Sequence, residues 1–130
     1  MHLKLYVIAA VCEDLGIGMN GNLPWNLKNF GSGTIPCKNI SDALDVISRP
    51  PLCEEVEKIW VIGGSSVYKE VLELPNFYRL YLTRIKKRFD CDTFFPELST
   101  DLVPVKDPNV PDGIQEENGI RFEYTVYERK

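Results

Sequence analysis

Runs of apolar residues, some unbroken and some alternating with polar ones, predict the strands of this chain. Residues 3–11 contain no polar side chain after Lys4, which predicts a strand buried on both faces and therefore a central one. Residues 59–62 form a second fully apolar strand. Residues 78–85 and 120–129 alternate, which predicts two more strands, the second of them long and antiparallel. A shorter extended segment is expected at 102–106.

Two segments between these strands carry helical signals. Ser41 is the expected N-cap of a helix that turns Ala43, Leu44 and Ile47 inward and ends at Pro50. A second helix is expected over 65–73, before Pro75. Residues 26–39 have no helical or strand period and indicate a loop. The alternation of strands and helices predicts a single α/β domain over 1–130.

Glycines follow both of the fully apolar strands, at 16–22 and at 63–64. If these strands are neighbours, both glycine stretches open onto one crevice at the carboxyl ends of the strands. Gly63-Gly64 leads into a helix whose first N–H groups and dipole favour a phosphate. An ordinary turn capped by Ser65 or Ser66 is the alternative. The stretch 16–22 is either a flexible lid or a plain surface connection, and Trp25 is more typical of a core anchor than of a ligand contact.

Composition narrows the class of protein. With 44% hydrophobic and 26% charged residues the chain is globular, and its net charge of -4 argues against a nucleic-acid or anionic-membrane partner. No apolar stretch is long enough to span a bilayer, and no signal peptide is evident. The four cysteines and His2 lack the spacing of a metal site, so no metal is expected and reduced thiols in the cytoplasm are the default.

The motifs, taken in order, resemble those of a known family. Ala9-Ala10-Val11, Gly16-Ile17-Gly18 and 21–25 (GNLPW) resemble the opening of dihydrofolate reductases. Residues 59–70 (IWVIGGSSVYKE) look like the animal-type cofactor-binding strand and helix. The segments 82–85 (LTRI), 92–96 (DTFFP) and 122–127 (FEYTVY) follow in the family's order. The resemblance covers residues 3–29 and 35–129.

This resemblance implies an NADPH-dependent reduction of dihydrofolate to tetrahydrofolate in one-carbon metabolism, on a mixed sheet with flanking helices. Dihydrofolate or antifolate-like molecules would be its ligands. The substrate would contact Ile8, Ala9, Trp25, Tyr68 and Thr83. The cofactor would contact Ala10, Gly16, Ile17, Gly18, Gly21, Asn22, Ile62, Gly63, Gly64, Ser65, Ser66, Val67 and Tyr68. The stretch 16–22 would be the family's mobile loop.

The resemblance also implies an internal deletion after about residue 30. The family's helix with its acidic residue is missing, and Phe30 or Gly31 stands where the acid would be, so no catalytic residue is assigned; neither residue can relay a proton. The family's central strands and the helix between them are missing as well. Turnover is therefore expected to be weak or absent. The alternative is a non-catalytic fragment that binds nucleotide or pairs with the full-length enzyme. Strand 59–62 would become an exposed edge, which favours self-association.

Overall fold

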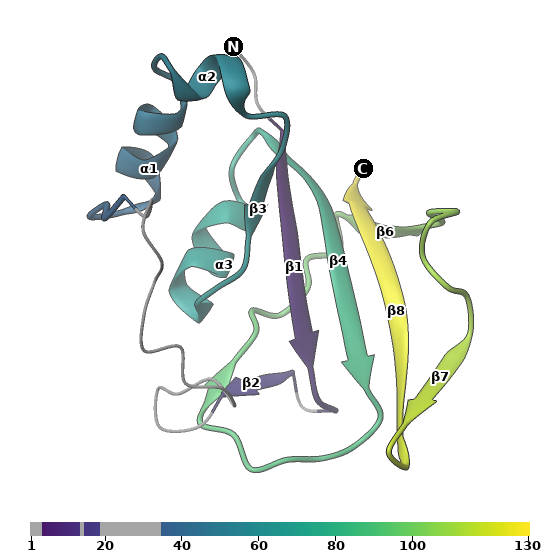
Figure 1. Cartoon of the computed structure of the whole chain (residues 1–130). Helices are drawn as coiled ribbons and strands as arrows, with labels where there is room; N and C mark the ends of the chain where they lie inside the picture. The colour runs from purple at the N-terminus through teal and green to yellow at the C-terminus, as the bar shows by residue number, and fades with distance from the viewer. Residues whose placement is uncertain (1–3, 14, 19–34) are drawn as a thin grey trace.

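The protein is described by a computed structural model that covers residues 4–13, 15–18 and 35–130. Within these ranges the main sheet has six strands, five of them in the order β3-β1-β4-β8-β6, with β7 paired to β8 (Figure 1). The strands are β1 (Leu5–Val11), β3 (Ile59–Val61), β4 (Phe77–Ile85), β6 (Leu102–Val105), β7 (Ile114–Glu117) and β8 (Ile120–Arg129). β1 is parallel to both β3 and β4, whereas β8 is antiparallel to β4, β6 and β7. The predicted mixed α/β sheet is confirmed.

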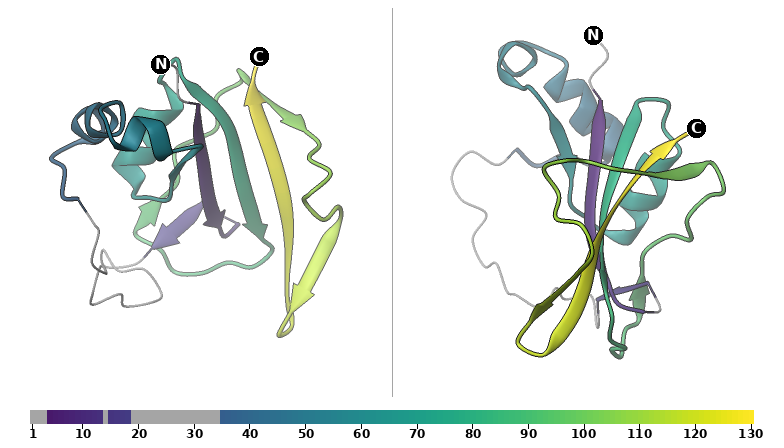
Figure 2. Two further views of the ribbon diagram at one scale, coloured as in Figure 1. Left: turned by 45° about the horizontal axis from the view of Figure 1, so that its top comes forward. Right: turned by 90° about the vertical axis from the view of Figure 1, so that its right-hand side faces the viewer.

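One side of this sheet, which we call the closed face, carries the core. Leu5, Val7, Leu80 and Leu82 are at most 1% exposed there. Helix α3 (Ser65–Leu72) lies on this side and adds Tyr68 and Val71 to the same cluster (Figure 2). The alternation of side chains along β1 and β4 therefore gives α3 a continuous apolar surface to pack on.

The opposite side of β1, β3 and β4, which we call the open face, is partly exposed. It carries Tyr6, Ile8, Ala10, Trp60 and Thr83, and the side chains of Ile8 and Trp60 are each 44% exposed. The prediction that β1 is central is confirmed, but the prediction that it is buried on both faces is wrong. Because almost every residue of this strand is apolar, the pattern does not show which of its two faces would be left without a packing partner.

Helix α1 (Ile40–Ile47) begins two residues earlier than predicted, because Ser41 was the expected N-cap. Asn39 is the N-cap, and its Oδ1 accepts a hydrogen bond of 2.7 Å from the backbone N–H of Asp42. Starting at Ile40 adds that residue to the stripe of Leu44 and Ile47, which packs against the core at helical spacing. A four-residue helix, α2 (Leu52–Glu55), follows and was not predicted because it is too short to show a period. No residue of α1 is buried.

A second sheet pairs β2 (Gly16–Gly18) with β5 (Thr93–Phe94). The predicted glycine loop therefore begins as a strand. This strand was not predicted because glycine has a low strand propensity. β2 is instead identified by its backbone pairing with β5. The backbone N–H of Phe95 extends this pairing by donating to the carbonyl oxygen of Leu15, at 2.7 Å.

The end of β8 is tied to the end of α3. The guanidinium of Arg129 donates to the carbonyl oxygen of Leu74 at 2.9 Å and also to that of Leu72. These carbonyls lie at and just beyond the C-terminus of α3, where helix carbonyls lack partners within the helix. Within the described ranges, no helix has the length and apolar composition needed to cross a membrane.

Candidate functional site

The candidate site lies at the edge where β1, β3 and β4 end. All three strands run in the same direction, and β3 pairs directly with β1 in the register Leu5 to Ile59. Their carboxyl ends therefore point to the same end of the sheet, and the turns that follow β1 and β3 both lead toward it (Figure 1). The expectation that the two apolar strands are neighbours is confirmed, and β3 ends opposite Val7, four residues before β1 ends. That the two glycine stretches open onto one crevice stays a prediction.

The turn between β3 and α3 exposes backbone where the helix begins. Gly63 has a φ of +142°, which side chains other than hydrogen rarely tolerate, and its peptide bond to Gly64 is cis. Gly64 is the N-cap and makes no side-chain capping bond, so the predicted alternative of a Ser65 or Ser66 cap is wrong. No described atom lies within 4 Å of a carbon added at Gly64. The start of α3 thus offers open space beside N–H groups that no capping side chain occupies.

Several of the predicted ligand contacts gather on the open face at the same edge. Ile8 and Ala10 project there from β1, and Thr83 lies opposite Ala10 on the neighbouring β4. Ile62, just after β3, is 75% exposed. Ala9 differs, because it is 8% exposed and belongs to the core cluster of the closed face. The open face therefore presents apolar side chains beside one hydroxyl group at the carboxyl ends of the strands.

Tyr68 links α3 to β1. Its hydroxyl donates a hydrogen bond of 2.9 Å to the carbonyl oxygen of Ile8, and its ring lies 4.8 Å from the ring of Phe95. Only 5% of Tyr68 is exposed, and burial raises the pKa of its hydroxyl to about 12. At neutral pH this phenol keeps its proton, so it positions β1 and is a poor acid. Sequence reasoning missed Phe95, although the apolar pair in 94–95 marks a buried anchor.

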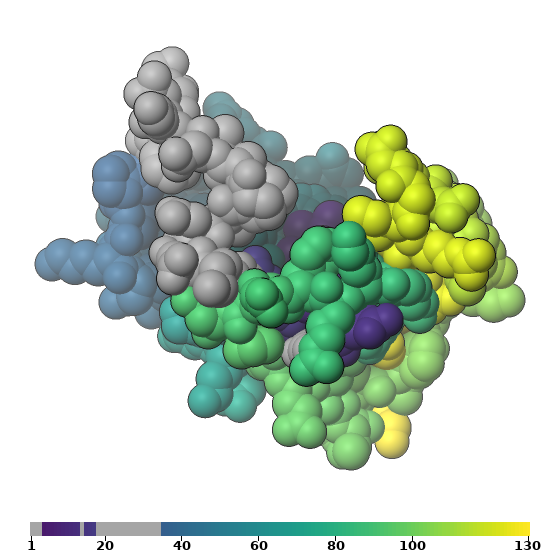
Figure 3. Space-filling model, turned by 90° about the horizontal axis from the view of Figure 1, so that it is seen from below, coloured from purple at the N-terminus to yellow at the C-terminus, as the bar shows by residue number. Residues whose placement is uncertain are grey.

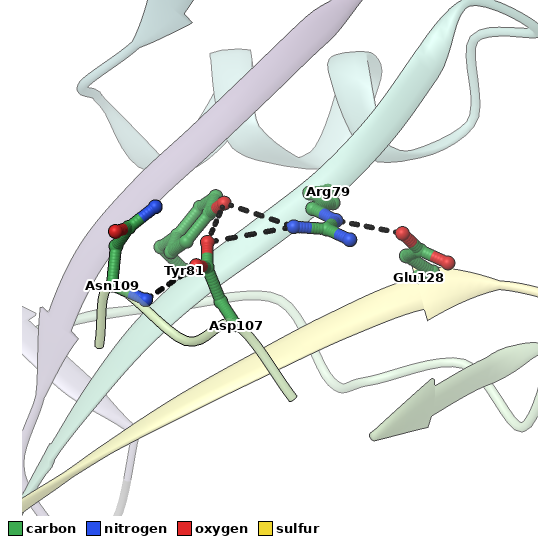
Figure 4. A network of polar contacts seen from close by, with 5 residues as sticks. All are labelled: Arg79, Tyr81, Asp107, Asn109 and Glu128. Carbon is green, nitrogen blue, oxygen red and sulfur yellow. Dashed lines mark hydrogen bonds and ion pairs between the residues drawn. The ribbon is translucent and has the colours of Figure 1, made fainter. Parts of the chain in front are cut away.

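Two carboxylates on the open face, those of Asp107 and Glu128, lie in a polar network (Figure 4). Arg79 Nε donates to Glu128 at 2.6 Å, and the Tyr81 hydroxyl donates to Asp107 at 2.7 Å. The backbone N–H of Asn109 and the Tyr81 hydroxyl hold the pKa of Asp107 below its usual range. Arg79 pairs with Tyr6, near the start of β1, whereas the glycine turns follow its end. Tyr81, however, pairs with Ile8, so the network extends from the start of β1 to its middle, and the lowered pKa of Asp107 makes that carboxyl a poor proton donor.

None of the buried side chains among the described residues carries a charge.

The remaining predicted cofactor contacts lie in two elements. Gly16, Ile17 and Gly18 form β2, and Ser65, Ser66 and Val67 form the first turn of α3. The other predicted contacts, Gly21, Asn22 and Trp25, lie outside the described residues, as do Phe30 and Gly31.

Comparison with known proteins finds similarity over nearly the whole chain. The family model described as dihydrofolate reductase matches residues 32–129. Dihydrofolate reductase of Aedes albopictus is 33% identical over 181 positions, and that of Rattus norvegicus is 34% identical over 183, each covering 97% of both chains. Schistosoma mansoni dihydrofolate reductase has a TM-score of 0.79 with full coverage of both chains, and its 24% identity supports the fold alone.

The lengths of these alignments also bear on the expected deletion. They extend over more positions than the 130 residues of this chain, so the relatives have residues where this chain has none. The matches nevertheless cover nearly the whole of this chain and of each relative. The chain belongs to the dihydrofolate reductase family, oxidoreductases that reduce dihydrofolate to tetrahydrofolate with NADPH.

Proposed function

We propose that this chain, as one domain, binds the nicotinamide and pyrophosphate portion of NADPH at the edge where β1 and β3 end. The observation that supports this is the parallel pairing of β1 with β3, which directs the turns that lead to Gly16 and to Gly63 toward the same end of the sheet. The backbone of Gly63 to Val67 receives the pyrophosphate, and Ala10 with Ile62 borders the nicotinamide. Gly16, Ile17 and Gly18, with Gly21 and Asn22, complete the cofactor side.

The described residues suit such a cofactor. The start of α3 has free space at Gly64 and no competing cap, which favours a phosphate there. Exposed Ile62 and Ile8 offer apolar surface for a flat ring. When bound, the cofactor supplies the hydride. The chain's own residues bind and orient it and exclude water from one side of the ring.

The pterin ring of dihydrofolate is proposed to lie over Ile8 and Thr83, with Trp25 as a further contact, whereas Ala9 and Tyr68 belong to the core of the closed face and support the site from behind. Tyr68 holds the Ile8 carbonyl and so fixes the floor of this site. The family's acidic residue has no counterpart in the sequence, where Phe30 or Gly31 takes its place. Losing a positioned proton-handling group costs about 10²–10⁴-fold in rate. We therefore propose that cofactor binding persists while turnover is weak.

A pair of glycine variants tests the cofactor site. Gly63 and Gly113 both have positive φ values, +142° and +82°, but Gly113 lies just before β7, on the far side of β8 from β1 and β3. Gly63→Ala should weaken NADPH binding, measured by quenching of protein fluorescence, and Gly113→Ala, also at a positive φ, should leave NADPH binding unchanged. Equal loss in both variants would mean that the effect is general destabilisation. Absence of quenching in the unaltered chain would refute cofactor binding.

Activity is measured separately, by following NADPH consumption with dihydrofolate at acidic and neutral pH. Rates as high as those of ordinary enzymes would contradict the proposed loss of the proton-handling group. Acid-enhanced but slow turnover would agree with it, because solvent protons then replace the missing carboxyl.

The outer side of β3 is the proposed route to self-association. Among the described residues β3 pairs with β1 alone, and Trp60 within β3 and Ile62 just after it are exposed. An apolar edge of this kind templates pairing with a second chain. A cytoplasmic location completes the proposal and is supported by the four cysteines, none of which forms a disulfide in the structure.

A further inference from the structure

Two cysteine side chains converge on Gly16. A carbon added to Gly16 would lie 2.5 Å from the sulfur of Cys91 and 2.9 Å from the sulfur of Cys12. Both sulfur atoms therefore lie on the same side of Gly16, and their separation cannot exceed these two distances taken together. Cys12 directly follows β1, and Cys91 lies between β4 and β5, so residues almost eighty positions apart in sequence meet here.

Backbone hydrogen bonds hold these two segments in place. The N–H of Cys12 donates to the carbonyl oxygen of Gly16 at 3.1 Å, which shapes the turn between β1 and β2. The N–H of Glu13 donates to the carbonyl oxygen of Lys87 at 3.2 Å, which ties that turn to the segment after β4. Figure 3 shows the purple N-terminal segment lying against the green segment that follows β4. The geometry that brings the thiols together is thus fixed by the fold.

The two thiols differ in access. Cys12 is 5% exposed and Cys91 is half-buried. Cys37 precedes α1 and Cys53 lies in α2, so both belong to a different part of the chain. An oxidant in solution therefore reaches Cys91 first, with Cys12 held beside it as the group that can react next.

We propose that Cys12 and Cys91 form a specific, reversible disulfide when the protein meets a small-molecule disulfide such as oxidised glutathione. The Cys91 thiolate attacks one glutathione sulfur and releases a first glutathione thiol. The Cys12 thiolate then attacks the Cys91 sulfur and releases a second. The two cysteines lose two protons and two electrons in total, and one glutathione disulfide becomes two thiols. A rotation of the side chains brings the sulfur atoms to the bonding distance of about 2 Å.

The bond would fasten the β1–β2 turn to the β4–β5 segment. Both sulfurs lie against Gly16, which pairs with Phe94 of β5, so the start of β2 would lose the freedom to move away from β5. The chemistry does not depend on nucleotide binding. The disulfide can therefore form whether or not the proposed cofactor site is correct.

Peptide mapping tests the pairing directly, because trypsin places each cysteine in a separate peptide. Cys12 falls in 5–28, Cys37 in 29–38, Cys53 in 39–58 and Cys91 in 89–106. The full-length chain is treated with oxidised glutathione, alkylated, digested without reductant and analysed by mass spectrometry. We expect the 5–28 and 89–106 peptides to be joined in most oxidised molecules. In strong denaturant the same pair should fall to about one third, because four cysteines then join in three ways at random.

Serine variants provide the controls. Cys91→Ser should abolish the joined peptide, whereas Cys37→Ser should leave it unchanged. Two results would overturn the proposal. One is equal pairing frequencies with and without denaturant. The other is a folded chain, checked by circular dichroism, in which Cys12 and Cys91 stay as thiols or as separate glutathione adducts.

Discussion

The two faces of β1 are built from the same kind of residue but differ in what covers them. On the closed face Leu5 and Val7 are fully buried beneath α3, whereas on the open face Ile8 is 44% exposed. Trp60, beside Tyr6 at a ring distance of 5.0 Å, is exposed to the same extent. A strand that evolved for a solvated face would alternate apolar with polar residues. The open face of β1 is nevertheless apolar, and the described residues leave it partly uncovered.

The largest effect should come from a truncation on the closed face. Leu82→Ala removes a side chain that is 1% exposed and should lower the free energy of unfolding by about 2–5 kcal/mol. Ile8→Ala on the open face is the matched control and should cost well under half as much, because its side chain is already partly hydrated. Chemical denaturation measures both. Equal losses would mean that the open face is as well packed as the closed one.

A smaller effect on stability is expected from Tyr68, which joins α3 on the closed face to the backbone of Ile8 in β1. Tyr68→Phe keeps the ring against Phe95 but removes the hydrogen bond to the Ile8 carbonyl, at a cost of about 1 kcal/mol. The raised pKa adds a signature in alkali. Between pH 10, the ordinary value, and about 12 the unfolded chain loses the Tyr68 proton while the folded chain keeps it, so stability falls as pH rises. Tyr68→Phe should flatten that part of the profile, measured as the melting temperature across alkaline buffers.

Changes to the open face should alter association more than stability. Ile62→Lys, at a residue that is 75% exposed, should shift the free energy of unfolding by no more than about 0.5 kcal/mol. It should nevertheless reduce self-association in sedimentation velocity, because a charge beside the β3 edge opposes pairing. Ile35→Lys is the control, since Ile35 is 56% exposed and lies outside the sheet. If both variants lower association equally, the β3 edge has no special role.

The smallest effect should appear in acid, at the polar network of the open face. The lowered pKa of Asp107 means that its stabilising contribution is present above the ordinary carboxyl value and is lost as pH falls through the folded one. Asp107→Asn should therefore be less stable than the unaltered chain at neutral pH, and the difference should shrink below about pH 4. Thermal melts in a series of acidic buffers measure this. A difference that stays constant with pH would exclude the carboxylate charge as its cause.

The sequence was most informative where a pattern was long. The runs at β1 and β3, the alternation of β4 and β8 and the helix after Gly64 were all predicted within a few residues. Short elements escaped, because α2 and β5 span too few residues to show a period. β7 was also missed, although Asn118-Gly119, both with positive φ, is a strong hairpin signal between it and β8.

The candidate site was predictable only in part, and for a physical reason. Motif order identified Gly63, Gly64 and Tyr68, but the hydrogen bond from Tyr68 to the Ile8 carbonyl depends on where α3 lies on the sheet. The exposure of Ile8 likewise depends on which residues are present to pack over it. The pattern of apolar residues shows where a strand lies, but it does not show whether another part of the chain packs on each face. The meeting of Cys12 with Cys91 at Gly16 depends on the path of the chain after β4.

The contact of Arg129 with the end of α3 has a consequence for how the protein is made. A ribosome releases the chain from its N-terminus, so Arg129 emerges some fifty-five residues after Leu72 and Leu74, whose carbonyl oxygens accept its hydrogen bonds. β1 must also wait for β3 and β4, its partners on either side, which are synthesised some fifty to seventy residues later. The sheet and the fastening of its helix are therefore completed only once β8 has been made. Until then the apolar β1 segment lacks part of the structure that covers it in the folded chain.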